Sequence, residues 1–314
     1  MRQLISVIHV TAVVALFPPS LSGMQEPARP SPEALRSAIA RQVAMVPGAE
    51  VGVSVRDLHS GLTLGLNETT EFHAASTMKV PVMLEVLRSV DEGRLALDQG
   101  VLLVNSFHSI VDGSPYDLSP GSDGDTTLYQ RTGERVAIRD LMERMIVRSS
   151  NLATNVLVSL VGAVQTTETA RRLGASRIQV RRGVEDGKAF AAGLINTTTS
   201  ADLAVLLERI EAGNALSPAS ARLMKEILLR QEFNDEIPAG LPAGVAVAHK
   251  TGAITATLHD AAIVYPPGRR PYVLVVLTRG IRDERVAREM IVSISRLVWT
   301  ALAAAGAPAA ATSP

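Results

Sequence analysis

The lysines of this chain indicate where its chemistry lies. Only four of its 31 basic residues are lysine, and the rest are arginine. Two of the four belong to short motifs, Ser-Thr-Met-Lys at 76–79 and Lys-Thr-Gly at 250–252. An arginine side chain keeps its proton in a protein, whereas a lysine that is desolvated or placed beside another cation can release it. A serine followed three residues later by a lysine therefore suggests a serine nucleophile that is activated by an amine.

The first motif places both reactive groups on one face of a predicted helix over Ser76–Val90, because residues three apart are neighbours on a helix surface. If Ser76 opens this helix, its backbone N–H is an unsatisfied donor that can polarise a carbonyl group. Ala74 and Ala75 precede the serine and leave it unshielded. Taken alone, the motif also fits a serine that caps a helix beside an exposed Lys79.

A second serine motif, Ser149-Ser150-Asn151, lies at the predicted junction of two helices. Side chains at such a junction project into a cleft, where Ser149 could relay a proton and Asn151 could hold a substrate amide. The alternative is that these residues only cap the helix that follows.

The Lys-Thr-Gly motif follows an alternating strand pattern at Val245–His249. Lys250 and Gly252 point to the same side of this strand, and the glycine lets a substrate backbone approach closely. The backbone N–H of Ala253 is a candidate oxyanion donor. An ordinary strand end is the alternative for this motif taken alone.

The order and setting of the three motifs are more specific than any one of them. Ser-x-x-Lys, Ser-x-Asn and Lys-Thr-Gly occur in this order, on a predicted helix start, an inter-helix turn and a strand. This trio is typical of class A β-lactamases and penicillin-binding proteins. The chain resembles the class A β-lactamase superfamily from about Pro32 to Ala304. Further segments carry the resemblance, namely Phe72–Val80, Asn151–Asn155, Thr197–Thr199 and Asp283–Arg285.

The resemblance implies a catalytic role for four residues. Ser76 would be the acylated nucleophile, and Lys79 would accept a proton. Ser149 would pass a proton to the leaving nitrogen. The backbone N–H groups of Ser76 and Ala253 would form the oxyanion hole.

The resemblance also implies how substrate is bound. Asn151 would bind the substrate amide, while Lys250 and Thr251 would face the substrate carboxylate beside Gly252. These enzymes often place a further arginine near that carboxylate. Arg279, just after the last predicted strand, is a candidate, and an ordinary surface arginine is the alternative.

The carboxylate that activates water in this superfamily lies in an Ω loop. Glu185 stands 12 residues before Thr197 and is the predicted hydrolytic base, with Asn155 as its expected partner. The Leu-Asn pair that normally follows the glutamate is missing, since Ala189 takes the place of the asparagine. Asp186 is a neighbouring candidate, and a solvated loop acid is the alternative interpretation of Glu185.

The remaining pattern predicts an α+β fold. Strands are predicted at 50–57, 63–66, 245–249, 260–265 and 272–277, and helices at 32–46, 76–90, 138–147, 151–161, 201–211, 218–229 and 284–304. We expect an antiparallel sheet of about five strands built from both chain ends, flanked by helices, with an inserted all-helical lobe. Residues 32–80 and 240–304 would form the α/β part of one catalytic domain, and residues 81–239 the helical lobe.

The segment between the first two motifs is longer than the resemblance leads us to expect. Residues 107–134 are rich in Gly, Ser, Asp and Pro, a composition typical of loops. They are predicted to form an exposed excursion. Part of it, residues 107–129, would lengthen the wall of the cleft and change the substrate range.

The N-terminal segment of the chain predicts export. The first 23 residues resemble a cleavable signal peptide, with Arg2 ahead of an apolar run at Leu4–Phe17. Residues 24–31 are predicted to form a flexible leader and residues 305–314 a disordered tail. The chain contains no cysteine, which excludes disulfides, thiolate metal sites and a cysteine nucleophile. We therefore expect a periplasmic or secreted protein.

The composition limits the classes of binding partner and cofactor that this protein is expected to have. The formal net charge is zero, so neither a nucleic acid nor an anionic membrane is implied. The six histidines show no ligand spacing, and no phosphate loop or dinucleotide fingerprint is present, so no metal or cofactor is predicted. His249 and His259 are interpreted as structural. We expect a monomer that acts on a small β-lactam or on a peptidoglycan-like substrate.

Three functions compete on this basis. The leading one is a serine β-lactamase, which opens the lactam through a Ser76 acyl-enzyme and releases it by hydrolysis. The second is a peptidoglycan D,D-peptidase or esterase on the same scaffold. The third is a penicillin-binding sensor that acylates without turnover. Deacylation separates them, because a sensor keeps its acyl group and a β-lactamase sheds it.

Overall fold

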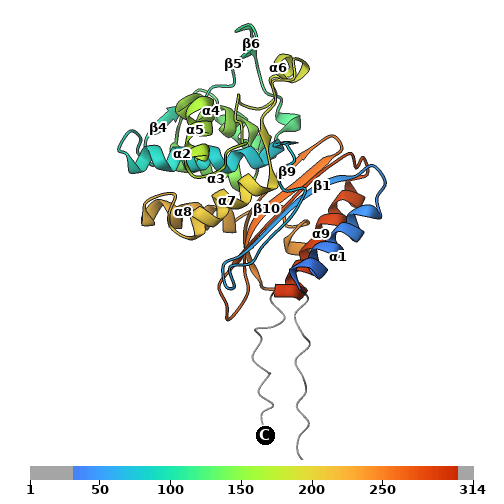
Figure 1. Ribbon diagram of the computed structural model, residues 1–314. Helices are drawn as coiled ribbons and strands as arrows, with labels where there is room; N and C mark the ends of the chain where they lie inside the picture. The colour runs from blue at the N-terminus through green and yellow to red at the C-terminus, as the bar shows by residue number, and fades with distance from the viewer. Residues whose placement is uncertain (1–30, 303–314) are drawn as a thin grey trace, which may run out of the picture.

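The computed structural model describes residues 31–302, and its centre is a five-stranded antiparallel sheet (Figure 1). The strands follow the order β2-β1-β11-β10-β9 and comprise β1 (Glu50–Asp57), β2 (Thr63–Leu66), β9 (Ala246–Ile254), β10 (Thr257–Tyr265) and β11 (Tyr272–Arg279). Val53 lies opposite Val276 where β1, from the start of the chain, pairs with β11, from its end. The predicted sheet built from both chain ends is confirmed.

Two helices from opposite ends of the chain, α1 (Pro32–Ala44) and α9 (Glu284–Leu302), lie side by side on one face of the sheet (Figure 1). Alternate residues of β1, Val51, Val53 and Val55, are fully buried in the apolar core that these helices cover. This is the two-residue period expected of a strand with one face against a helical layer.

A helical lobe packs on the other face of the sheet. Its helices are α2 (Lys79–Asp91), α3 (Ile138–Val147), α4 (Asn151–Val161), α5 (Ala163–Arg172), α7 (Ser200–Glu211) and α8 (Pro218–Leu229). Helix α2 is buried along nearly its whole circumference, with ten of its 13 residues inaccessible, as expected for a helix surrounded by others. Its first residues therefore meet the sheet at the boundary between the two layers.

Several elements differ from the predicted ones. The strand predicted to end at His249 continues to Ile254, so the Lys-Thr-Gly motif lies within β9 and pairs with β10. The helix predicted from Ser76 begins as a 3-10 turn, η1 (Ala75–Met78), before α2 starts. Helices α5 and α6 (Gly187–Ala191) were not predicted. α5 is rich in threonine and α6 is little more than one turn, so neither has a strong helical pattern.

The predicted excursion is exposed over most of residues 107–134, but several of its residues are buried and anchor it to the helical lobe. Residues 107–134 form β5 (Phe107–His108), β6 (Pro115–Tyr116) and two 3-10 turns, η2 (Pro120–Ser122) and η3 (Thr126–Arg131). Leu128 is fully buried, and the Asp125 carboxylate pairs with Arg144 at 2.6 Å. The polar composition indicated solvent exposure, whereas several of these polar groups bond to the helical lobe.

Short strand pairs connect the site segments. β3 (Phe72–His73) pairs with β8 (Thr197–Thr198), which joins the chain just ahead of Ser76 to the exit of the Ω loop. Two more elements complete the list of short strands, β4 (Gly100–Leu102) and β7 (Arg135–Ala137), and a last 3-10 turn is η4 (Pro238–Gly240). The pairing of β3 with β8 places the nucleophile segment and the loop in one structural unit.

Some predictions fall outside the described residues. The predicted signal peptide, nearly all of the leader and the predicted tail belong to residues 1–30 and 303–314. Among residues 31–302, no helix combines the length and the apolar character that crossing a membrane requires.

Candidate active site

Ser76 lies where the turn η1 meets strand β9. A Cβ atom added to Gly252 would sit 3.0 Å from Ser76 N, which is closer than side chains normally approach a backbone. The glycine therefore lets the strand pack directly against the start of the turn. Ala75 adopts a left-handed φ of 44°, and its N–H donates to His73 Nδ1 at 2.9 Å. Ser76 and Ala253, the two residues whose N–H groups are the candidate oxyanion donors, both line the cavities at this point.

Lys79 is completely buried, and its Nζ donates three hydrogen bonds. They go to the Ser149 carbonyl at 2.7 Å, the Ser149 hydroxyl at 3.0 Å and Asn151 Oδ1 at 2.8 Å. The backbone N–H of Lys79 donates to the Ser76 carbonyl, but no side-chain hydrogen bond found among residues 31–302 joins the Lys79 amine to the Ser76 hydroxyl. Burial, together with the nearby charge of Lys250, holds the pKa of Lys79 well below its ordinary value. Its amine is therefore suited to accept a proton.

The junction between α3 and α4 serves two purposes. Ser149 has a left-handed φ of 56°, which turns both its carbonyl and its hydroxyl toward Lys79. Ser150 caps α4 by accepting a hydrogen bond from Ala153 N at 3.2 Å. Asn151 is then the first helical residue, and its side chain lines the cleft. The capping role and the functional role considered for this motif thus fall on different residues.

The segment between β6 and η3 supplies two side chains that sequence analysis missed, Ser122 and Asp123. Asp123 Oδ2 accepts hydrogen bonds from the backbone N–H groups of Asn151 and Leu152, both at 2.9 Å. A carboxylate is favoured there because a helix start has unpaired N–H groups and a positive dipole end. Tyr129 donates to the same oxygen at 2.8 Å. Asp123 thereby holds the start of α4, and with it Asn151, in place.

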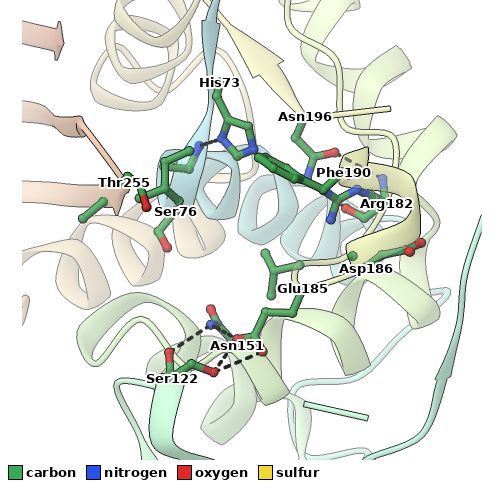
Figure 2. Close-up of a pocket in the computed structure, with 15 residues that line it drawn as sticks. His73, Ser76, Ser122, Asn151, Arg182, Glu185, Asp186, Phe190, Asn196 and Thr255 are labelled. Atoms are coloured by element: carbon green, nitrogen blue, oxygen red, sulfur yellow. Dashed lines mark hydrogen bonds between the residues drawn. The ribbon is translucent and has the colours of Figure 1, made fainter. Parts of the chain in front are cut away.

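Glu185 reaches the same cluster from the Ω loop. Its Oε1 accepts a hydrogen bond from Asn151 Nδ2 at 2.7 Å, and the Ser122 hydroxyl lies 3.2 and 3.1 Å from its two oxygens. Figure 2 shows these three side chains together, across the cavity from Ser76. Because Asn151 also accepts from Lys79, one amide links the buried amine to the exposed carboxylate.

The expected pairing of Asn155 with Glu185 is wrong. The Asn155 amide binds the backbone of Val184 instead, accepting from its N at 2.6 Å and donating to its O at 3.0 Å. A Cβ atom on Gly183 would lie 2.3 Å from Asn155 Oδ1, so only glycine permits this approach. Asn155 therefore fixes the loop backbone. The backbone of Glu185 adopts a left-handed φ of 61°.

Asp186, the neighbouring acid, is a structural anchor. Its Oδ1 accepts from Ala189 N at 3.0 Å, which caps α6, and from Ser109 Oγ at 2.9 Å, while its Oδ2 accepts from Ile110 N at 3.0 Å. Burial opposes ionisation, but these hydrogen bonds outweigh it and hold the pKa of Asp186 below its ordinary value. In Figure 2 its carboxylate points away from Ser76.

Lys250 lies behind the cleft rather than in it. It is completely buried, and its Nζ donates to the Thr251 carbonyl at 2.9 Å. Burial lowers its pKa to about 7, against the opposing influence of Asp260 and Glu236. Thr251 and Gly252 are the motif residues that line the cavity next to it. Any effect of Lys250 on a substrate carboxylate would be electrostatic and pass through this wall.

Arg279 does not serve the cleft. Its Nε donates to Glu50 at 2.7 Å, and its guanidinium lies 5.0 Å from the centre of the Phe72 ring, so the surface interpretation holds. Arg288 of α9 reaches the cleft instead and bonds to Glu284 at 2.6 Å. No spacing in the sequence singled out this arginine among the others of the last helix.

The two histidines that were interpreted as structural are both buried in the sheet. His249 Nδ1 lies 3.0 Å from Asp260 Oδ1. His259 Nε2 lies 2.8 Å from the carbonyl of His73, which ties β10 to the segment ahead of Ser76. Burial lowers the pKa of His259 to about 4, so this ring is neutral when it makes that contact.

Two cavities meet at Ser76. The larger, of 540 Å³, lies toward the Ω loop and is lined by Glu185, Phe190 and Arg182 (Figure 2). The smaller, of 280 Å³, lies toward β9 and α9. Four residues line both: Ser76, Ser122, Asn151 and Ala253. A substrate whose reacting carbonyl sits at Ser76 would therefore extend into a separate chamber on each side.

The placement of a serine, a buried lysine and a second serine around one cleft, between a sheet and a helical lobe, is that of the active-site-serine hydrolases. Comparison with known proteins narrows the class. Residues 34–302 match the model of the β-lactamase enzyme family. A β-lactamase of Streptomyces albus G is 30% identical over 250 residues, which cover 78% of this chain and 77% of that protein.

Solved structures agree with this comparison. A β-lactamase from Sphaerobacter thermophilus superposes with a TM-score of 0.74 at 26% identity, covering 85% of this chain and 96% of that one. A single-site variant of PBP-A, captured as an acyl-enzyme with penicillin G, superposes with a TM-score of 0.73 at 29% identity, covering 85% and 95%. The chain belongs to the β-lactamase enzyme family and is a serine hydrolase of the class A β-lactamase superfamily.

Proposed function

We propose that this enzyme opens β-lactam rings through a Ser76 acyl-enzyme and releases the product by water-mediated deacylation. The observation that carries the proposal is the hydrogen-bonded chain from Lys79 through Asn151 to Glu185 beside Ser76. It supports a mechanism in which Lys79 accepts a proton during acylation and the Glu185 carboxylate assists hydrolysis. The relatives named as β-lactamases and the PBP-A acyl-enzyme with penicillin G support a lactam as the substrate.

In acylation, the Ser76 oxygen attacks the lactam carbonyl and its proton passes to the Lys79 amine. The N–H groups of Ser76 and Ala253 stabilise the oxyanion. The carbonyl–nitrogen bond then breaks, and the Ser149 hydroxyl, 3.0 Å from Lys79 Nζ, gives its proton to the leaving nitrogen and is reprotonated by Lys79. Ser149 thus connects the amine to the leaving group.

In deacylation, water attacks the ester carbonyl and gives a proton to Glu185. The bond between the carbonyl carbon and the Ser76 oxygen breaks, and that oxygen takes up the proton that Glu185 had accepted, which restores the carboxylate. Glu185 is exposed in the larger cavity, so water reaches it. This step completes a hydrolytic cycle without change of oxidation state.

A second candidate, on the same site, is a D,D-peptidase or esterase, or a penicillin-binding sensor that keeps its acyl group. One observation favours slow release: the Glu185 carboxylate already accepts hydrogen bonds from Asn151 and Ser122. These bonds occupy carboxylate oxygens that would otherwise accept a hydrogen bond from the attacking water.

Nitrocefin turnover by the purified protein, followed with intact-mass measurement of the enzyme, tests the proposal. A β-lactamase hydrolyses many equivalents and returns to its unmodified mass. A stoichiometric adduct that persists for hours would support the sensor or peptidase instead. No turnover and no adduct would remove the proposed function altogether.

Lys79→Arg is expected to impair acylation nearly as severely as Lys79→Ala, by about a hundred- to ten-thousandfold. The guanidinium keeps the positive charge but does not accept a proton at neutral pH. In the parent enzyme, the acylation rate should rise with pH through the lowered pKa of Lys79 and level off below the range of an ordinary lysine. The measurement is the rate of labelling by a fluorescent penicillin between pH 5 and 10.

Lys188→Arg is the matched control, because Lys188 lies on the surface and pairs with Asp112 at 2.7 Å. It should label at the parent rate. Melting temperatures of both arginine variants verify folding. A Lys79→Arg enzyme that labels as fast as the parent would show that Lys79 supplies only a charge.

A further inference from the structure

The smaller cavity carries charges that the proposed lactam chemistry does not use. Its lining includes three carboxylates, Asp235, Glu236 and Glu284, and one guanidinium, that of Arg288. Arg288 bonds to Glu284 at 2.6 Å, and its Nε lies 3.6 Å from Glu236 Oε1. The lining thus carries one cation and three anions, and the buried Lys250 lies behind the part of the wall that Thr251 and Gly252 form.

Glu236 is buried without the partners that a buried carboxylate normally has. The residue is 5% exposed, and its Oε2 has no hydrogen-bond partner among residues 31–302. An unpaired buried carboxylate oxygen is costly, so Oε2 can accept a bond from a further donor. Arg288 Nε, 3.6 Å from Glu236 Oε1, likewise has no hydrogen-bond partner among the described residues. Two causes raise the pKa of Glu236 to about 7: burial, which is the larger, and the negative charge of the nearby Asp260. Above that pH the carboxylate is ionised and lacks a full counter-charge.

The position of this cavity defines which part of a substrate enters it. Ser149, the proposed proton donor to the leaving nitrogen, and Thr251 line the smaller cavity, whereas Glu185 lines the larger one. The acyl side chain of a β-lactam therefore faces the Ω loop. The second ring, attached through the leaving nitrogen, faces Glu236 with its substituents.

We propose that the smaller cavity is a selectivity site for β-lactams that carry a cationic substituent on the ring attached to the leaving nitrogen. The proposal rests on the proposed lactam function. Asp235, Glu236 and Glu284 attract the cation, and Glu236 Oε2 gains the partner that it lacks. Opposite charges within one partly desolvated cavity discriminate between ligands even when each contact is weak.

Cephalothin and cephaloridine form a matched pair of probes. Both carry the same thienylacetamido side chain, and they differ only in a neutral acetoxymethyl or a cationic pyridiniomethyl group on the second ring. The second-order rate constant of acylation is measured for each by rapid-quench intact mass at pH 8, where Glu236 is ionised. Glu236→Gln is expected to lower the cationic-to-neutral ratio of rate constants by about five- to tenfold. The rate with the neutral compound should change less than about twofold.

Glu289→Gln is the matched control, because Glu289 lies on the same helix as Arg288, pairs with Arg285 at 2.7 Å and is no part of the cavity lining. It should leave the ratio unchanged. Asp235→Asn, at an exposed residue whose change is compatible with folding, should lower the ratio in the same direction.

The outcomes separate the two proposals. Adducts with both compounds, at a ratio that neither Glu236→Gln nor Asp235→Asn alters, would overturn the selectivity site and leave the lactam function standing. If the parent enzyme neither forms an adduct with the two compounds nor hydrolyses them, the function fails and the selectivity proposal with it. A ratio that falls in both variants but not in Glu289→Gln supports it.

Discussion

Ser76→Ala is expected to abolish both lactam turnover and covalent labelling by penicillins. The loss should approach the roughly millionfold scale seen when a serine hydrolase loses its nucleophile. Ser76 lines both cavities together with Ala253, and the buried Lys79 follows it by three residues, at the start of α2. Bocillin labelling and nitrocefin turnover measure the two losses separately.

The fold should not suffer from this change. The Ser76 hydroxyl makes no hydrogen bond among those found in residues 31–302, so alanine removes no structural contact. Its melting temperature is expected to stay within about two degrees of the parent value. Ser149→Ala is a useful comparison, because it should slow acylation while leaving Ser76 open to labelling. Persistent labelling of Ser76→Ala at the parent rate would disprove the nucleophile assignment.

Glu185→Gln is expected to leave acylation largely intact and to slow hydrolysis of the acyl-enzyme by about a hundred- to ten-thousandfold. Glutamine keeps the size of the side chain but removes the carboxylate that would accept a proton from water. The acyl-enzyme should therefore accumulate within a single turnover. Intact mass after mixing with penicillin G, sampled from milliseconds to hours, measures its formation and decay.

Asp186→Asn provides the contrast. Its carboxylate anchors α6 and the chain at Ser109, so its loss should lower stability by about 1–3 kcal/mol while deacylation stays near the parent rate. Ser122→Ala tests how Glu185 is held, since it removes the hydroxyl that contacts both carboxylate oxygens. If Glu185→Gln hydrolyses penicillin at the parent rate, the hydrolytic base lies elsewhere. A parent enzyme that never deacylates would favour the peptidase or sensor instead.

Local patterns in the sequence were sufficient for most of the regular structure. The alternation of Val51, Val53 and Val55 and the apolar run after Lys79 depend on the periods of strand and helix, which neighbouring residues establish. The predicted bounds of β1, β2, α3, α4 and α8 are confirmed. The errors came where local signals are weak, as in the threonine-rich α5 and the short α6.

The polar excursion shows the limit of composition as a guide. A run rich in Gly, Ser and Asp is typical of solvent-exposed loops, yet Asp123 and Asp125 are buried and bonded to the helical lobe. Whether such carboxylates face water or helix N–H groups depends on where the loop packs against the rest of the protein. The neighbouring residues in the sequence do not predict that position.

The sequence by itself determined the order and the chemical types of the reactive groups: Ser76 before Lys79, then Ser149 and Asn151, then Lys250. Only the tertiary structure decided which of them touch. It joined the Lys79 amine to Ser149 and Asn151 rather than to the Ser76 hydroxyl, and brought acids from distant segments to the cleft. The physical reason is that short-range periodicity is set by adjacent residues, whereas contacts between residues far apart in the chain depend on how sheet, lobe and loops pack together.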